Sequence, residues 1–116
     1  MIYVVLVAHW VGDFLLQDSR LALNKYRDRW CLLEHCVTYA STMGVASSFI
    51  LPPERAVVFA LVNAAAHLVI DAVTSRWTHK TWGWAEHPRV FWNVIGFDQL
   101  LHVTLLALTL KAVTAW

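Results

Sequence analysis

Three apolar segments of this chain each carry one histidine and one aspartate four residues apart, and this spacing strongly limits the fold. The pairs are His9 with Asp13, His67 with Asp71, and Asp98 with His102. Residues four apart on a helix lie on one face, about 6 Å from each other. Each segment is therefore expected to be a helix with one polar patch on an otherwise apolar surface.

The chain has too few charged residues for an ordinary soluble protein of its size. Of its 116 residues, 59% are hydrophobic and only 15% are charged. Typical soluble domains carry roughly 25% charged residues, and a small domain has a large surface to cover. We therefore predict one integral membrane domain over residues 1–116. The net charge of +1 offers no basic surface for nucleic acid.

Apolar runs predict helices at about residues 2–18, 31–51, 55–75 and 91–114. A bilayer core needs about 20 helical residues, so the first helix is short. The second run is followed by two prolines, which cannot continue a helix. Two polar connections and one tight turn join these runs. The expected fold is all-α, a four-helix transmembrane bundle with up-down-up-down topology.

Lysines and arginines are concentrated in the first and third connections, and this predicts the orientation of the chain. Such residues favour the cytoplasmic side in short loops. The opposite side has only Arg55 and Lys111. We expect a multi-pass protein with both termini outside. The first apolar run has no basic start, so no cleavable signal peptide is expected.

The histidines and aspartates fall at matched depths in the predicted bundle. At 1.5 Å per residue, the paired histidines lie about 12–16 Å from the cytoplasmic helix ends, and the aspartates about 6–10 Å. His35, in the second helix, joins the aspartates at about 6 Å. One ionised aspartate near the membrane centre costs about 2.5–3.5 kcal/mol. These carboxylates therefore need compensation by partners, water or a cation.

A divalent metal ion provides that compensation and accepts neutral imidazole as a ligand. The expected ligands are His9, Asp13, His35, His67, Asp71, Asp98 and His102. Zinc is the metal we favour, with manganese or iron as alternatives. One ion with supporting partners and a two-metal site both remain open. A proton relay and a purely structural polar core are the alternatives to a metal.

Further residues are candidates for catalysis and substrate binding. The general base would be Glu34, or whichever of Asp13 and Asp98 is not a ligand; a solvated role at the helix start is the alternative for Glu34. Basic residues at the cytoplasmic mouth would contact lipid headgroups or bind a substrate phosphate. These are Arg20, Lys25, Arg76 and Lys80. Gln17, Gln99 and Tyr39 are expected beside the cluster, and Cys31 and Cys36 as free, buried thiols.

Several motifs of this chain resemble a family of short phage and bacterial integral membrane proteins of unknown function. They are HWVGDFLLQ at 9–17, Glu34-His35 with Tyr39, HLVIDAVT at 67–74 and DQLLH at 98–102. The resemblance spans nearly the whole chain. A phage origin would imply a role in host takeover or envelope remodelling.

The stretch that contains His67, Asp71 and Thr74 also resembles the membrane-bound metal-dependent hydrolases of bacterial inner membranes. This likeness covers one helix, and the chain lacks that family's other His-rich motifs. It implies His67 and Asp71 as metal ligands, a hydrolytic reaction and an inner-membrane location.

The main functional hypothesis is a membrane-embedded, metal-dependent hydrolase that acts on a phosphate-bearing lipid or nucleotide at the cytoplasmic leaflet. The alternative is a non-enzymatic membrane protein: an ion or proton channel, a carrier, or a phage effector that binds a host membrane protein. The expected partners are the lipid bilayer and an anionic lipid or nucleotide, with no nucleic acid. A homo-oligomer is compatible with the sequence.

Overall fold

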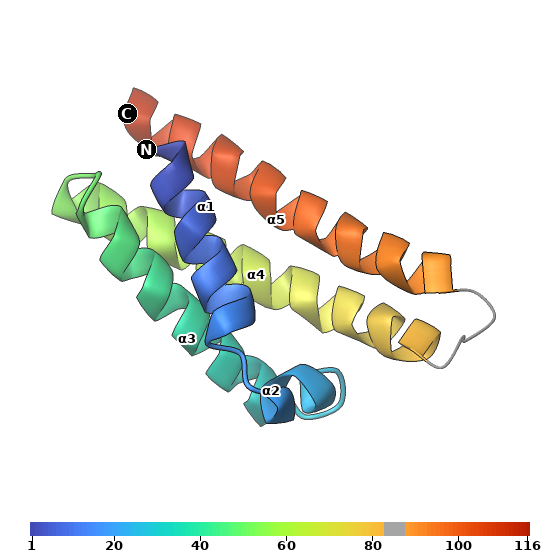
Figure 1. Cartoon of the computed structure of the whole chain (residues 1–116). Helices are drawn as coiled ribbons and strands as arrows, with labels where there is room; N and C mark the ends of the chain where they lie inside the picture. Colours follow the sequence, from blue (N-terminus) through green and yellow to red (C-terminus); the bar gives the residue numbers. More distant parts are fainter. Residues whose placement is uncertain (83–87) are drawn as a thin grey trace.

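The computed structural model describes residues 1–82 and 88–116, which form an all-α fold without a β-strand (Figure 1). The elements are α1 (Ile2–Trp10), the π-helix η1 (Val11–Leu15), α2 (Ser19–Asn24), α3 (Arg29–Ser48), α4 (Pro53–Trp82) and α5 (Pro88–Ala115). The predicted all-α class is confirmed. The short helix α2 lies in the first polar connection, where the sequence pattern predicts none.

Aspartate side chains cap the two helices that border this connection. Asp18 accepts a hydrogen bond of 2.8 Å from the main-chain N–H of Leu21, at the start of α2. Asp28 accepts one of 2.8 Å from Trp30 N, at the start of α3. Such caps satisfy N–H groups that have no partner within the helix. Helix α3 therefore begins at Arg29 rather than at residue 31.

Helix α4 continues beyond the apolar run that predicts it. The apolar run predicts an end near residue 75, but the helix reaches Trp82. No glycine or proline interrupts the sequence from residue 54 to 82, and Arg76 and Lys80 are good helix formers. With 30 residues, α4 is about 45 Å long. Its polar final turns extend the helix past the length of a bilayer core.

The π-helix η1 brings the chain close to α3. The N–H of Leu16 bonds to the carbonyl of Val11 at 2.9 Å, a step of five residues, which widens the turn. A Cβ on Gly12 would lie 3.3 Å from Cδ2 of Tyr39 and 3.4 Å from its Cα. Only glycine allows η1 and α3 to approach this closely without displacement.

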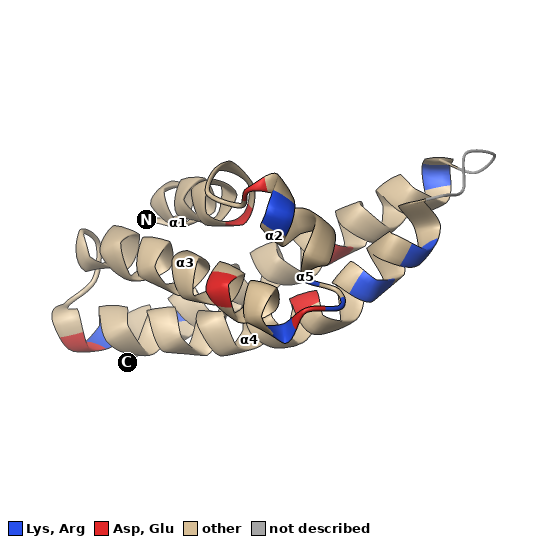
Figure 2. Ribbon diagram, turned by 90° about the horizontal axis from the view of Figure 1, so that it is seen from below, with Lys and Arg blue, Asp and Glu red and all other residues tan. Residues whose placement is uncertain are grey.

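Helix α4 packs between α3 and α5, and α1 lies across α3 and α5 (Figure 1). An apolar core fills the space between them, with Val5, Tyr39, Met43, Phe59 and Leu106 almost fully buried. Both ends of the chain lie at the same end of the molecule (Figures 1 and 2).

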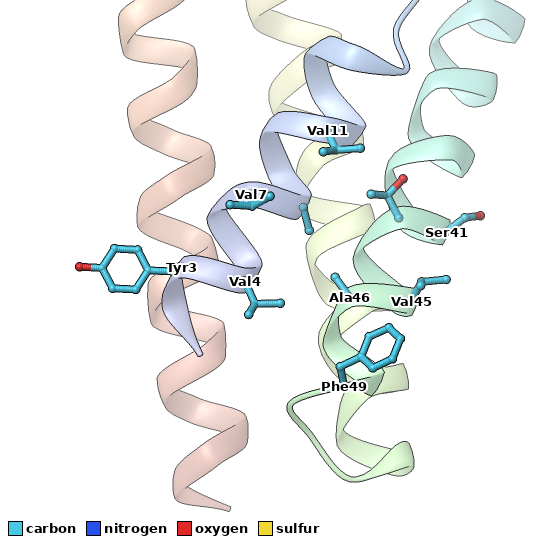
Figure 3. A pocket seen from close by; sticks show the side chains of 10 residues that line it. Tyr3, Val4, Val7, Val11, Ser41, Val45, Ala46 and Phe49 are labelled. Carbon is cyan, nitrogen blue, oxygen red and sulfur yellow. The ribbon is translucent and has the colours of Figure 1, made fainter.

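Many of the exposed side chains on these helices are large and apolar. On α4, Val57, Leu61 and Val69 are 58%, 64% and 65% exposed. An apolar groove of about 780 Å³ runs between α1 and α3 (Figure 3). In the described residues, α4 and α5 are long and apolar enough to cross a membrane, judged by length and composition. Ile2–Leu15 forms a shorter apolar helix.

Charged residues are unevenly distributed over the described structure (Figure 2). Lysines and arginines lie around α2, along the C-terminal part of α4 and at the start of α5. The other end of the molecule is mostly uncharged, apart from the start of α4 and a lysine in α5.

Candidate metal centre

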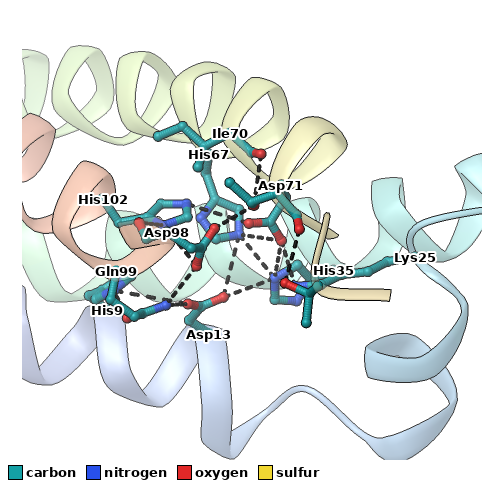
Figure 4. A network of polar contacts seen from close by, with 12 residues as sticks. His9, Asp13, Lys25, His35, His67, Ile70, Asp71, Asp98, Gln99 and His102 are labelled. Carbon is teal, nitrogen blue, oxygen red and sulfur yellow. Dashed lines mark hydrogen bonds and ion pairs between the residues drawn. The ribbon is translucent and has the colours of Figure 1, made fainter. Parts of the chain in front are cut away.

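Histidines and aspartates from five elements of the fold meet in one polar network (Figure 4). They are His9 from α1, Asp13 from η1, His35 from α3, His67 and Asp71 from α4, and Asp98 and His102 from α5. Six of the seven residues are at most 4% exposed, and the side chain of Asp98 is 15% exposed. The structure thus places all seven predicted ligands in one network, although His9 belongs to neither group of residues that could hold a metal ion.

Four of these residues form the tightest group. Asp13, His35, His67 and Asp71 each offer one ligand atom, and these atoms lie within 4.8 Å of one another. His35 Nε2 lies 2.9 Å from His67 Nε2, 3.1 Å from Asp13 Oδ1 and 3.2 Å from Asp71 Oδ2. Two imidazoles and two carboxylates that converge in a buried space are ligands typical of a divalent metal ion.

A second group shares Asp13 with the first. Ligand atoms of Asp13, Asp98 and His102 also lie within 4.8 Å of one another. Gln99 Nε2 donates to Asp13 Oδ2 at 2.8 Å and to Asp98 Oδ2 at 3.0 Å. Its Oε1 lies 3.0 Å from His9 Nε2. Gln99 therefore links α1, η1 and α5 around the cluster, as the sequence predicts for a residue beside the ligands.

Lys25 enters the cluster from the segment that follows α2. Its Nζ donates to Asp71 Oδ2 at 2.6 Å, and its side chain is only 15% exposed. Burial favours the neutral amine, but the charges of Asp71 and Asp13 outweigh burial, so the pKa of Lys25 lies above its usual value. The sequence predicts Lys25 at the mouth of the site, whereas in the structure its ammonium reaches the predicted metal ligands.

The other predicted catalytic and basic residues lie outside the cluster. Glu34 is at the surface, where its carboxylate accepts a hydrogen bond of 2.7 Å from Arg20. Arg76 donates to the carbonyl of Ala72 on its own helix, and Lys80 is exposed. Glu34 precedes His35 by one residue and therefore points away from it, about 100° around the helix. In this arrangement Glu34 is not placed to act as a base.

A cavity of about 700 Å³ borders the cluster and opens beside α2. Asp13, Asp98 and Gln99 contribute to its lining. The basic residues Lys25 and Arg27 line it as well, and Tyr26 and His79 stack at its side, with ring centroids 3.7 Å apart. A small anionic molecule in this cavity would touch both the cluster and basic side chains.

Two residues support the cluster from within the helices. Tyr39 stacks on His67 with ring centroids 3.9 Å apart, so it faces the cluster as its spacing from His35 predicts. Thr74 Oγ1 donates to Asp98 Oδ1 at 2.5 Å, a contact that was not predicted from the sequence. Thr74 lies seven residues after His67 and three after Asp71, and this helical spacing could have indicated it.

The described cysteines, Cys31 and Cys36, are both free and buried, as their spacing predicts. Neither belongs to a group of candidate metal ligands.

The chain belongs to a family described as protein of unknown function (DUF3307), which matches residues 1–116. This confirms the resemblance to a family of unknown function. No curated protein and no solved structure matches the chain.

Proposed function

We propose that this member of the DUF3307 family is an integral membrane enzyme that uses a divalent metal ion to hydrolyse a phosphate-bearing lipid or nucleotide. The observation that carries the proposal is the buried convergence of Asp13, His35, His67 and Asp71 beside an open cavity. The ion would be held by two imidazole nitrogens and two carboxylate oxygens. Such a set suits tetrahedral zinc, and manganese or iron would also accept it.

Electrostatics favours a cation in the cluster. The buried carboxylates of Asp13 and Asp71 and the partly buried one of Asp98 lie close together, and Lys25 is the one lysine or arginine that bonds to them in the described structure. Neutral imidazoles cannot balance the remaining charge, and ionised carboxylates are costly to bury without partners. A divalent ion removes this cost and also joins helices that are distant in the sequence.

The apolar exterior supports a membrane location. Large exposed aliphatic faces such as that of α4 are unfavourable in water, whereas contact with lipid tails is favourable for them. We propose that α1 with η1, α3, α4 and α5 all cross a bacterial inner membrane, with both termini outside. The lysines and arginines around α2, at the end of α4 and at the start of α5 would then face the cytoplasm.

The cavity supports a reaction on an anionic substrate. Lys25 and Arg27 would bind a phosphate group, while Asp98, which is not one of the four ligands, would accept a proton beside it. A bound metal ion would lower the pKa of a coordinated water towards 7. The cavity lies at the charged end of the molecule, so the substrate would reach it from the cytoplasm or the inner leaflet.

The apolar core argues against the alternative of an ion or proton path. Val5, Met43, Phe59 and Leu106 each lie one or two helical turns from a cluster histidine, on the side of the chain ends. They are buried and offer no polar group to a passing ion. The described structure therefore fits a site that opens to one side.

Elemental analysis of the detergent-purified protein tests the metal. We expect zinc or manganese in the parent and its loss in His67→Ala. The matched control is His79→Ala, which removes an exposed histidine from the same helix and should keep the metal. Equal metal content in all three proteins would contradict the proposal.

Two further assays test the location and the reaction. The protein should stay in the membrane pellet after an alkaline carbonate wash, and release into the supernatant would contradict a membrane-spanning chain. The metal-loaded parent should release phosphate from phosphatidic acid or from a nucleoside triphosphate, and His67→Ala should not. No release from either substrate would contradict a phosphate hydrolase.

A further inference from the structure

We propose that the cluster binds two divalent metal ions rather than one. The second ion would lie at Asp13, Asp98 and His102, next to the ion proposed at Asp13, His35, His67 and Asp71. This inference rests on the proposed function, because it adds a partner ion to the same centre.

Asp13 presents its two oxygens to different parts of the cluster. Oδ1 lies 3.1 Å from His35 Nε2 and 3.7 Å from His67 Nε2. Oδ2 accepts from Gln99 at 2.8 Å, on the side of α5. A carboxylate in this position can give one oxygen to each of two ions. Two-metal hydrolytic sites hold their ions about 3.5–4 Å apart, a distance that one carboxylate can bridge.

Asp71 has the same two-sided arrangement. Its Oδ2 lies 3.2 Å from His35 Nε2 and 3.5 Å from His67 Nε2. Its Oδ1 lies 3.5 Å from His102 Nε2. The two aspartates thus connect the histidines of α3 and α4 with the histidine of α5 (Figure 4).

His102 has the orientation of a metal ligand. Its Nδ1 lies 3.0 Å from the main-chain carbonyl of Asp98, and a carbonyl only accepts, so Nδ1 carries the hydrogen. In the neutral imidazole, which is the form that binds a metal, Nε2 then holds a free lone pair. This atom is buried in a residue only 2% exposed, and no described side chain or main-chain group bonds to it. Metal-bound histidines are commonly held by such a bond from the other ring nitrogen.

Asp98 is held in place by partners that leave it open to the cavity. Thr74 donates to Oδ1 at 2.5 Å and Gln99 to Oδ2 at 3.0 Å. These bonds fix the carboxylate without neutralising it, which suits a ligand. Asp98 also lines the cavity, so an ion bound there would contact a substrate directly.

The charge balance of a two-ion centre favours a phosphate substrate. Two divalent ions together with Lys25 outweigh the three carboxylates of the cluster. The surplus positive charge would be matched by a bound hydroxide and by the phosphate oxygens of the substrate. A single ion with Lys25 would leave the cluster neutral, with less attraction for an anion.

Metal stoichiometry tests this inference. The protein is stripped with a chelator, saturated with Mn²⁺, desalted and analysed for manganese per chain. We expect two ions in the parent and in the His79→Ala control, and one ion in His102→Ala and in Asp98→Asn. Electron paramagnetic resonance of the Mn²⁺-loaded parent should show a coupled pair, and this measurement needs no variant.

The outcomes separate the two proposals. One ion in the parent, without a coupled signal, overturns the second site, and the proposed single-metal function stands. No ion in the parent overturns both proposals. Two ions that persist in His102→Ala and Asp98→Asn overturn the assignment of the second site to these residues.

Discussion

The ammonium of Lys25 lies 2.6 Å from Oδ2 of Asp71, the same oxygen that faces His35 and His67. Lys25 thus supplies a positive charge where we propose a metal ion. In the metal-free protein it stabilises a carboxylate that would otherwise be buried without a counter-charge. In the metal-bound protein it would repel the ion or turn towards the substrate.

Replacing Lys25 by methionine should separate these two effects. Lys25→Met should lower the stability of the metal-free protein by about 3 kcal/mol or more, because it leaves Asp71 buried and unpaired. The same change should raise metal affinity at least tenfold, or about 1.4 kcal/mol. Thermal unfolding with and without Zn²⁺, and competition with a chelating dye, measure the two effects. Arg27→Met, a neighbouring basic residue of the cavity, should change neither by a comparable amount.

The close approach at Gly12 predicts a steric effect on the site. Gly12→Ala adds a methyl group 3.3 Å from the Tyr39 ring and 3.4 Å from its Cα, so η1 must move away from α3. We expect a loss of about 1–3 kcal/mol and weaker metal binding, because Asp13 follows Gly12. Gly96→Ala is the control, since its Cβ would meet nothing within 4 Å, and α5 should gain up to about 1 kcal/mol. Equal stability and equal metal affinity of Gly12→Ala and Gly96→Ala would contradict a steric effect at Gly12.

Thr74 is expected to position Asp98. Thr74→Val keeps the shape of the side chain and removes its hydrogen bond to Asp98. Loss of such a supporting bond lowers metal affinity by about 10–100-fold in known sites, and Mn²⁺ titration measures the change. Thr78→Val, one turn later, removes only a bond to the main chain of Thr74 and should bind Mn²⁺ as the parent does.

The cap of α3 predicts a dependence of stability on pH. The hydrogen bond from Trp30 N lowers the pKa of Asp28 in the folded protein. The ionised Asp28 cap therefore contributes fully to the stability of the folded protein above the ordinary pKa of about 3.9. This contribution disappears as the pH falls through the lowered pKa of the folded protein. Asp28→Ala should be less stable than the parent at pH 7, and the difference should vanish in acid. Asp28→Asn keeps a capping oxygen that does not titrate. The stability that this variant gains over Asp28→Ala should therefore be the same at pH 7 and in acid.

Helical spacing explains why the sequence could predict the cluster. His67 and Asp71 must share a face on any helix, and the opposite order of Asp98 and His102 follows from the opposite direction of α5. These relationships depend only on local geometry and on the alternation of helix direction. The structure brings the predicted ligands together for that reason.

Helical spacing could not predict the contacts that irregular segments make. Lys25 reaches Asp71 from the turn after α2, and no periodic pattern connects it with α4. The wide turn of η1 changes the direction of Asp13 in a way that a regular helix does not. Helix α4 passes the end of its apolar run because a helix ends at a breaker or a cap, and polar residues such as Lys80 are neither.

The first and last helices of the chain meet through Gln99, which bonds to His9 and Asp13. The ligands of the proposed second ion include Asp98 and His102 and are therefore incomplete in a growing polypeptide until α5 has been synthesised and has packed against its neighbours. Capture of that ion would then be a late event in biogenesis, one that distinguishes a fully assembled chain from a truncated one.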